Sequence, residues 1–415
     1  MKRNVIVGQS GGPTAAINSS LAGVFRTAKD RGFNKVYGML HGVEGLMNER
    51  YIDLADHIQT DLDVELLRRT PASFLGCCRY KMPGIHENKE VYEKIFSILD
   101  KLEIDVFIYI GGNDSMDTIK KLSDYAILTG HNCRFLGCPK TIDNDLALTD
   151  HTPGFGSAAK YIGTSMKEII RDSFSMQYDK GIVTVVEIMG RNAGWLTGAA
   201  ALSKCEDCEG PDMIFLPELP FDLKKFQNDV KSLLEKKTSV VVAVSEGIHD
   251  KAGKYIAEYG TGVDFVDAFG HKQLQGTAAF LCNLLSAELG CKTRSIEFSS
   301  LQRAASHMAS RVDILEAYQV GGAAVKAADE GDTGKMVVLQ RISDDPYQCS
   351  TEVKDVHKIA NDEKVVPREW INKDGNFVTD EFISYVEPLI QGDVSPVMVD
   401  GIPRHLISPK ELYMK

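Results

Sequence analysis

The feature that most constrains this chain is a set of apolar, β-branched runs, each ending at glycine or a polar loop. Residues 4–9 (NVIVGQ) and residues 106–110 (VFIYI) are two of them. Almost every position in them is apolar, so the corresponding strands are expected to be buried on both faces. Stretches of helical period separate the runs, as where Met116, Ile119 and Leu122 share one helical face. The pattern predicts the α/β class, with mainly parallel sheets flanked by helices on both sides.

Length and charge limit the number of domains and the kinds of partner that this chain can have. A chain of 415 residues predicts two domains, and a net charge of −11 argues against a nucleic-acid partner. No apolar run is long enough for a membrane span, and the first strand follows the start without a signal peptide, so we expect a cytoplasmic protein without a membrane partner. The nine cysteines lack a paired spacing; Cys205 and Cys208 have no second pair, which favours free thiols over zinc.

The loops after the apolar runs carry most of the unusual residues. Ligands of parallel sheets bind beyond the carboxyl ends of the strands, so we expect these loops to converge at one sheet edge. Paired glycines at a strand-to-helix turn let backbone N–H groups approach a phosphate, and neither a P-loop nor a dinucleotide motif is present. The loops are Gly11–Gly12, Gly111–Ser115, the stretch 137–156, Met189–Asn192 and Ser245–Gly247.

The stretch PKTIDND, residues 139–145, suggests acid–base chemistry beside a phosphate. If it is extended, Asp143 and Asp145 point to one side and Asn144 to the other. Two carboxylates so close raise the pKa of one of them, which prepares it to accept a proton. Lys140 would supply a compact positive charge for phosphoryl oxygens. The alternative interpretation is a turn rich in Asp and Asn.

Six motifs together resemble the 6-phosphofructokinase family, over roughly residues 4–325. They are SGGPTAAIN, GGNDS, PKTIDND, MGRNAGW, VSEG and TRSIEFSSLQR, in the family's order and spacing. The resemblance is greatest to the pyrophosphate-dependent branch. It implies a glycolytic enzyme that reversibly transfers a phosphoryl group from pyrophosphate to the C1 hydroxyl of fructose 6-phosphate, giving fructose 1,6-bisphosphate and phosphate.

Two other functions stay open. One is an ATP-dependent phosphofructokinase, and the other is a sugar-phosphate-binding regulatory homologue without activity. The retained Asp143, Asp145 and Arg191 favour an enzyme, because a pure sensor needs no base. Sedoheptulose 7-phosphate is a second acceptor that the sequence does not exclude.

The resemblance also implies roles for single residues. Asp143 matches the general base, and Arg191 matches the arginine near the transferred phosphoryl group. Lys140 is the third candidate catalytic residue, as a cation beside the same group. Arg294 and Arg303 match the clamp on the sugar's 6-phosphate, and Arg294 would reach in from a neighbouring subunit of a homodimer or homotetramer. The implied substrate-binding set is Gly12, Arg79, Thr141, Asp145, Met189, Gly190, Glu246, Arg294 and Arg303.

Donor choice and metal binding depend on a few departures from ATP-using relatives. In those relatives the corresponding motifs resemble GGDGS and PGTIDND. Asp114 stands at the third glycine of the first motif, and Lys140 stands at the glycine of the second. The carboxylate of Asp114 would repel a nucleotide's α-phosphate, while Lys140 would hold pyrophosphate. Asn113 replaces an aspartate that helps to hold Mg²⁺, so Asn113 and Asp114 are the candidate ligands, with Asp114 or Asp145 taking more of the contact.

The family's architecture implies two Rossmann-like, three-layer domains with the active site in the cleft between them. Residues 1–152 would bind the donor, with a return segment near 302–350, and residues 153–301 would bind the sugar phosphate. Residues 351–415 form an extension of acidic, helical character that we interpret as a cover or an oligomer contact.

Overall fold

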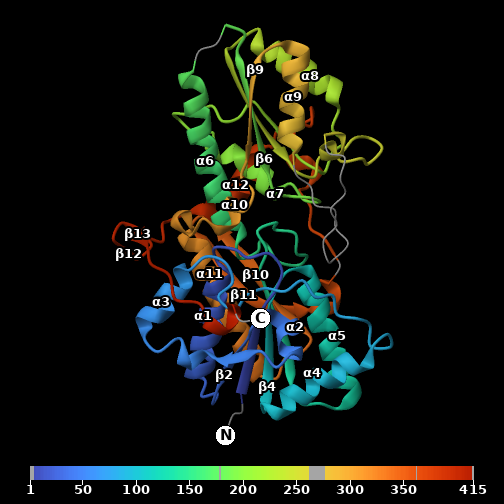
Figure 1. Ribbon diagram of the computed structural model, residues 1–415, viewed down its shortest axis with the longest axis vertical. Helices are drawn as coiled ribbons and strands as arrows, with labels where there is room; N and C mark the ends of the chain where they lie inside the picture. The colour runs from blue at the N-terminus through green and yellow to red at the C-terminus, as the bar shows by residue number, and fades with distance from the viewer. Residues whose placement is uncertain (1–3, 177–178, 261–275, 361, 414–415) are drawn as a thin grey trace.

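The computed structural model describes residues 4–176, 179–260, 276–360 and 362–413. These residues form two lobes, each built around one β-sheet with helices against it (Figure 1). The α/β class and the mainly parallel pairing predicted from the apolar runs are confirmed.

The larger lobe holds a seven-stranded sheet, counted over the described residues, in the order β11-β10-β5-β4-β1-β2-β3. The pairs from β10 to β2 are parallel, whereas β3 and β11 pair antiparallel at the two edges. The strands are β1 (Asn4–Gln9), β2 (Val36–Met39), β3 (Tyr51–Asp53), β4 (Ile104–Gly111), β5 (Arg134–Pro139), β10 (Lys335–Asp344) and β11 (Tyr347–Asp355).

Each face of this sheet packs into its own hydrophobic core. Val106 and Ile108 of β4 point into a core shared with two helices, α1 (Ile17–Asp30) and α11 (Arg311–Asp329). Phe107 and Tyr109, the alternate residues, enter a second core. That core is shared with α4 (Lys89–Lys101) and α5 (Asn113–Thr129), while α2 (Gly42–Met47) and α3 (Asp61–Arg69) complete the lobe's helices. Burial of every residue in the run, at ~1.5–3 kcal/mol for each large side chain, explains why apolar residues do not alternate with polar ones here.

Helix α11 brings a late part of the chain back to the first lobe. It packs closely against α1, because a Cβ at Gly23 would lie 2.0 Å from the carbonyl oxygen of Tyr318 and one at Gly321 would lie 2.0 Å from that of Ser20. Strand β10 then joins the sheet beside β5. Helix α11 and strand β10 therefore lie in the first lobe, although the second lobe precedes them in sequence.

The smaller lobe holds a parallel sheet, four-stranded within the described ranges, in the order β7-β8-β6-β9. Its strands are β6 (Ile182–Ile188), β7 (Met213–Phe215), β8 (Ser239–Ser245) and β9 (Lys292–Glu297). The helices of this lobe and its borders are α6 (Phe155–Ser175), α7 (Trp195–Gly198), α8 (Leu223–Leu234), α9 (Thr277–Leu289), α10 (Leu301–Ala304) and α12 (Asp380–Val386). The long α6 lies against one side of the sheet, and α8 and α9 lie against the other (Figure 1).

The C-terminal part differs from the helical character predicted for it. Residues 347–355 form strand β11, and the α-helical turns of this part lie in α12. Strand β11 is an edge strand with alternately exposed residues, and its polar composition led to the wrong prediction. After α12, the chain returns to the first lobe by way of β12 (Met398–Val399) and β13 (Ile402–Pro403), where the amide of Leu406 donates to Thr70 Oγ1 (2.9 Å).

Within the described ranges, no helix is both long and apolar enough to cross a membrane.

Candidate active site

A cavity of about 730 Å³ lies between the two lobes. The predicted loops do converge on it, but they come from two sheets rather than from one sheet edge. The loops after β1, β4 and β5 line it from the first lobe, and those after β6 and β8 line it from the second. Its lining includes Gly12, Arg79, Asn113, Asp114, Lys140, Thr141, Asp143, Asp145, Met189, Gly190, Arg191, Glu246 and Arg303. Of the predicted site residues, Arg294 alone does not line this cavity.

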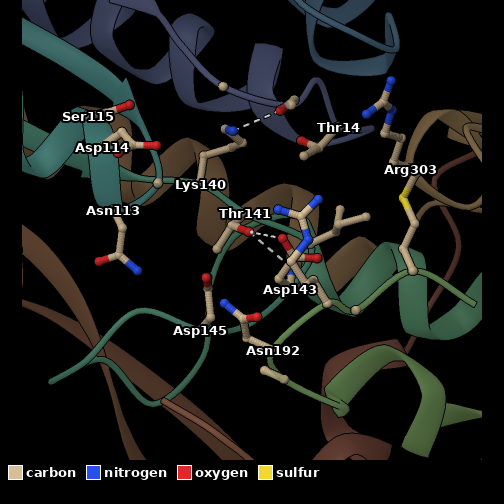
Figure 2. Close-up of a pocket in the computed structure, with 18 of the residues that line it drawn as sticks. Thr14, Asn113, Asp114, Ser115, Lys140, Thr141, Asp143, Asp145, Asn192 and Arg303 are labelled. Carbon is tan, nitrogen blue, oxygen red and sulfur yellow. Dashed lines mark hydrogen bonds between the residues drawn. The ribbon is translucent and has the colours of Figure 1, made fainter. Parts of the chain in front are cut away.

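The loop that carries the two aspartates is a turn rather than an extended segment. Asn144 has a left-handed backbone (φ 55°), which asparagine tolerates better than most residues. Its side chain is buried away from the cavity, where Nδ2 donates to the Tyr385 hydroxyl (2.9 Å) and Oδ1 accepts from the amide of Thr152 (3.1 Å). Asp143 and Asp145 both face the cavity (Figure 2). The prediction that the two aspartates point to one side and Asn144 to the other is therefore right. The predicted extended conformation is wrong.

Three carboxyl groups of the cavity have raised pKa values. Burial raises the pKa of Asp143, against the opposing effect of the Lys140 cation. Burial, and then the charge of Asp143, raises the pKa of Asp145 to about 7 and that of Glu246 to about 7. Thr141 fixes the first carboxylate, because its Oγ1 donates to Asp143 Oδ2 (3.3 Å). A carboxylate with a pKa raised toward neutrality is suited to accept a proton from an alcohol.

Lys140 places a buried cation next to these carboxylates. Only 2% of the residue is exposed, and its Nζ donates to the carbonyl oxygen of Gly12 (2.8 Å; Figure 2). Burial lowers the pKa of this lysine, and the charge of Asp143 acts in the opposite direction. An ammonium held in this way can give its remaining hydrogens to an anionic oxygen in the cavity.

The two glycine pairs differ in their setting. Gly112 directly precedes α5, so the pair Gly111–Gly112 stands at a helix N-terminus, where an anion is favoured. Gly11–Gly12 does not, because α1 begins only at Ile17. This pair lies beside cations instead, since Cβ atoms there would lie 3.3 Å from Lys140 Nζ and 3.7 Å from Arg303 Nη1.

The arginines fall into two groups. Arg79, Arg191 and Arg303 line the cavity. Arg294 lies on β9, the edge strand of the smaller sheet, and its Nη1 donates to Asp172 Oδ2 (2.6 Å). Within one chain, Arg294 therefore does not reach the ligand space. Its predicted role as an intersubunit clamp stays a prediction.

The loop after β6 carries the second lobe's share of the lining. The amide of Gly190 donates to Glu246 Oε1 (3.4 Å), and the amide of Met189 donates to Gln302 Oε1 (3.3 Å). Gly190 has φ 138°, and a Cβ there would lie 2.6 Å from the carbonyl oxygen of Ala193. The tight turn of the MGR motif therefore requires glycine at this position.

Two oxygens of the cavity fit a metal ion. Asn113 Oδ1 and Asp145 Oδ1 are buried and have no hydrogen-bond partner among the described residues. Oxygen ligands of this kind suit a hard divalent cation. Asp114, the other predicted ligand, lies in the first turn of α5 and also lines the cavity (Figure 2).

The sequence interpretation missed several lining residues. Asn192 Nδ2 donates to both carboxylate oxygens of Glu363, at 3.0 and 3.1 Å. Glu363 belongs to the C-terminal extension, and no local pattern marks it, because only the fold brings it to the cavity. Lys81 was open to prediction, since it stands two residues after Arg79 in the same loop.

Comparison with known proteins agrees with this geometry. Residues 4–328 match the model of the family described as phosphofructokinase. The chain is 38% identical, over 97% of its length and 95% of the relative, to the pyrophosphate–fructose 6-phosphate 1-phosphotransferase of Halomonas elongata. It is 39% identical, with the same coverage, to the protein of that name from Xanthomonas campestris. The crystal structure of a pyrophosphate-dependent phosphofructokinase from Nitrosospira multiformis superposes with a TM-score of 0.88 at 36% identity, covering 98% of this chain and 96% of that one.

The chain belongs to the phosphofructokinase family. Enzymes of this family generally use a divalent metal, which fits the two unpartnered oxygens in the cavity.

Proposed function

We propose that this protein transfers a phosphoryl group reversibly between pyrophosphate and the C1 hydroxyl of fructose 6-phosphate, as a step of glycolysis. The observation that carries the proposal is the pair Lys140 and Asp114 in one cavity, a buried cation for a short anionic donor and a carboxylate against a nucleotide. Relatives that share almost the whole chain bear the corresponding name.

The forward reaction needs a proton acceptor and charge neutralisation more than covalent catalysis. Asp143 takes the proton of the C1 hydroxyl, the sugar oxygen bonds to one phosphorus of pyrophosphate, and the bridging P–O bond breaks. Orthophosphate leaves with the electron pair of that bond. Lys140 and Arg191 neutralise charge on the transferred group, and the raised pKa of Asp143 suits it to take and return the proton.

The other site residues receive the roles that the resemblance to the family implies, and their place in the lining supports these roles. We assign Gly12 and Arg79 to pyrophosphate and Thr141 and Asp145 to the sugar and the transferred group. Met189, Gly190 and Glu246 face the sugar, and Arg303 holds its 6-phosphate. The first lobe, residues 1–152 with the return near 302–350, would bind the donor, and residues 153–301 would bind the sugar.

We assign Mg²⁺ as the divalent cation. Asn113 Oδ1 and Asp145 Oδ1 would hold it, with Asp114 nearby. When bound, the ion would neutralise charge on the pyrophosphate oxygens.

The active unit would be a homodimer or homotetramer in which Arg294 contributes to the 6-phosphate site of a neighbouring subunit. A cytoplasmic location stays the sequence-based prediction.

A coupled assay on the purified protein tests the proposal. Formation of fructose 1,6-bisphosphate is measured with pyrophosphate or ATP as donor, with and without Mg²⁺, and the reverse reaction is started with orthophosphate. We expect turnover with pyrophosphate in both directions and little with ATP. A higher kcat/KM for ATP would contradict the donor assignment, and turnover with neither donor would contradict the enzyme assignment.

A further inference from the structure

One short segment of the C-terminal extension, residues 363–366, passes between the catalytic loops of the two lobes. On one side, the amide of Lys364 donates to the carbonyl oxygen of Asp145 (2.8 Å). On the other side, the indole Nε1 of Trp195 donates to the carbonyl oxygen of Lys364 (2.9 Å). The segment is therefore hydrogen-bonded both to the loop that carries the two aspartates and to the start of α7, the helix that follows the Arg191 loop.

The side chain of Lys364 binds the aspartate loop at three points. Its Nζ donates to the carbonyl oxygens of Asp150 (2.6 Å) and Thr149 (3.2 Å) and to Asn144 Oδ1 (3.3 Å). An ammonium has three hydrogens to donate, and this geometry uses all of them. Asn144, with its left-handed backbone, is the residue between Asp143 and Asp145, so the ammonium holds the turn that aims both carboxylates.

Lys364 itself does not line the cavity, whereas Glu363 does. Any effect of Lys364 on turnover must therefore pass through the loop that it holds. The segment has an anchor that does not depend on this side chain, because Glu218 Oε1 accepts from the amides of both Gly194 (2.8 Å) and Val366 (2.9 Å). Removing the ammonium should leave the segment in place and loosen the aspartate loop alone.

We propose that Lys364 is a positioning residue for phosphoryl transfer, which fixes the turn at Asn144 and thereby the aim of Asp143 and Asp145 into the cavity. The inference rests on the function proposed above. It gives residues after 350 a part in the chemistry, whereas the sequence predicted only a cover or an oligomer contact for them. Misplacing a catalytic group by about 1 Å costs up to ~100-fold in rate, so the expected loss is of that order.

The test compares Lys364→Met with Lys364→Arg in the coupled assay with pyrophosphate and fructose 6-phosphate. The control is Lys358→Met, because Lys358 is an exposed lysine of the same extension. In Lys364→Met we expect kcat to fall by about 10- to 100-fold while KM for both substrates changes by less than about threefold, the signature of an interaction that acts in the transition state. Lys364→Arg should recover part of kcat, and Lys358→Met should match the wild type.

Two results would overturn the inference. One is a kcat within about twofold of wild type in Lys364→Met. The other is a fall in kcat and Tm together with a rise in both KM values, none of which Lys364→Arg reverses. This result would show a general structural role. A wild-type protein without activity in the same assay would overturn the proposed function first, and this inference with it.

Discussion

The two lobes contribute to the cavity in unequal ways. The first lobe brings its predicted charged groups to the cavity within one chain. They are the buried cation Lys140, beside Gly12, and the carboxylates Asp143 and Asp145. The second lobe brings the turn at Gly190 and the carboxylate Glu246, while Arg294, one of the two predicted ligands of the sugar's 6-phosphate, lies outside the cavity on an edge strand. Together with the proposed role of Arg294, this difference leads us to expect that one chain suffices for the donor side and that a second subunit completes the sugar side.

The largest effect is expected from the first lobe's base. Asp143→Asn keeps the shape of the side chain but removes the proton acceptor, so kcat should fall by about 10²- to 10⁴-fold while sugar binding largely survives. Steady-state kinetics with pyrophosphate, together with direct titration of fructose 6-phosphate, separate the two quantities. The exposed Asp362→Asn is the control. Turnover near that of the wild type would show that another group takes the proton.

The next effect tests whether the sugar side is shared between subunits. Arg303→Ala and Arg294→Ala should each raise KM for fructose 6-phosphate by about 10- to 100-fold, since a hydrogen bond to a charged group is worth ~1.5–3 kcal/mol. The exposed Arg171→Ala, on α6 like the partner of Arg294, should leave KM unchanged.

Mixed oligomers sharpen this prediction. Co-expression of the Arg294→Ala and Asp143→Asn chains creates hybrid sites in which one subunit supplies Asp143 and the other supplies Arg294. Activity at low sugar concentration should then exceed that of either variant alone. No recovery in verified mixed oligomers would remove the intersubunit role.

A smaller effect concerns the point where the chain passes from one lobe to the other. His151 is buried there, with Nδ1 2.8 Å from Asp150 Oδ2 and Nε2 2.7 Å from Glu316 Oε2. Burial alone would lower the pKa of this histidine, but the two carboxylates outweigh it and raise the pKa to about 9. The native protein therefore holds this proton to higher pH than the unfolded chain, whose histidine has a pKa of ~6.5.

The stability that this proton provides is complete below pH 6.5 and is lost as the pH rises through about 9. We expect the free energy of unfolding to fall by on the order of 1–3 kcal/mol over this range, measured by denaturant titration at several pH values. His151→Gln should flatten the dependence, whereas the exposed His86→Gln should not. An unchanged slope in His151→Gln would contradict this account.

The two lobes also show how much of the fold can be predicted from the sequence. The continuous apolar runs predicted β1 and β4 well, because burial on both faces leaves a pattern that depends on neighbouring residues alone. The motifs located the loops of the cavity for the same reason. Edge strand β11 was not predicted, because its exposed face gives it a polar composition like that of a surface helix.

Other features depend on contacts between distant parts of the chain. Glu363 and Lys364 reach the site from more than 200 residues after the aspartates, through the return of the extension between the lobes. The left-handed turn at Asn144 is held by Lys364 and Tyr385. The local sequence TIDND offered a turn as the alternative, but these distant contacts, which decide between the two conformations, cannot be read from it. The two-residue period of an extended segment correctly predicted that both carboxylates point to one side. The backbone conformation assumed for that prediction was wrong.

The measurement that tests the account most directly is donor preference across Asp114 and Lys140 variants. Values of kcat/KM for pyrophosphate and ATP are compared in the wild type, Asp114→Gly, Lys140→Gly and the double variant. Loss of the Lys140 contact should cost about 10- to 100-fold with pyrophosphate, from ~1.5–3 kcal/mol for a charged hydrogen bond. Asp114→Gly alone should admit ATP at a low rate, and the double variant should have the largest ratio of ATP to pyrophosphate use. Full pyrophosphate activity in both Lys140 variants would contradict the claim that this buried cation makes the cavity a pyrophosphate site.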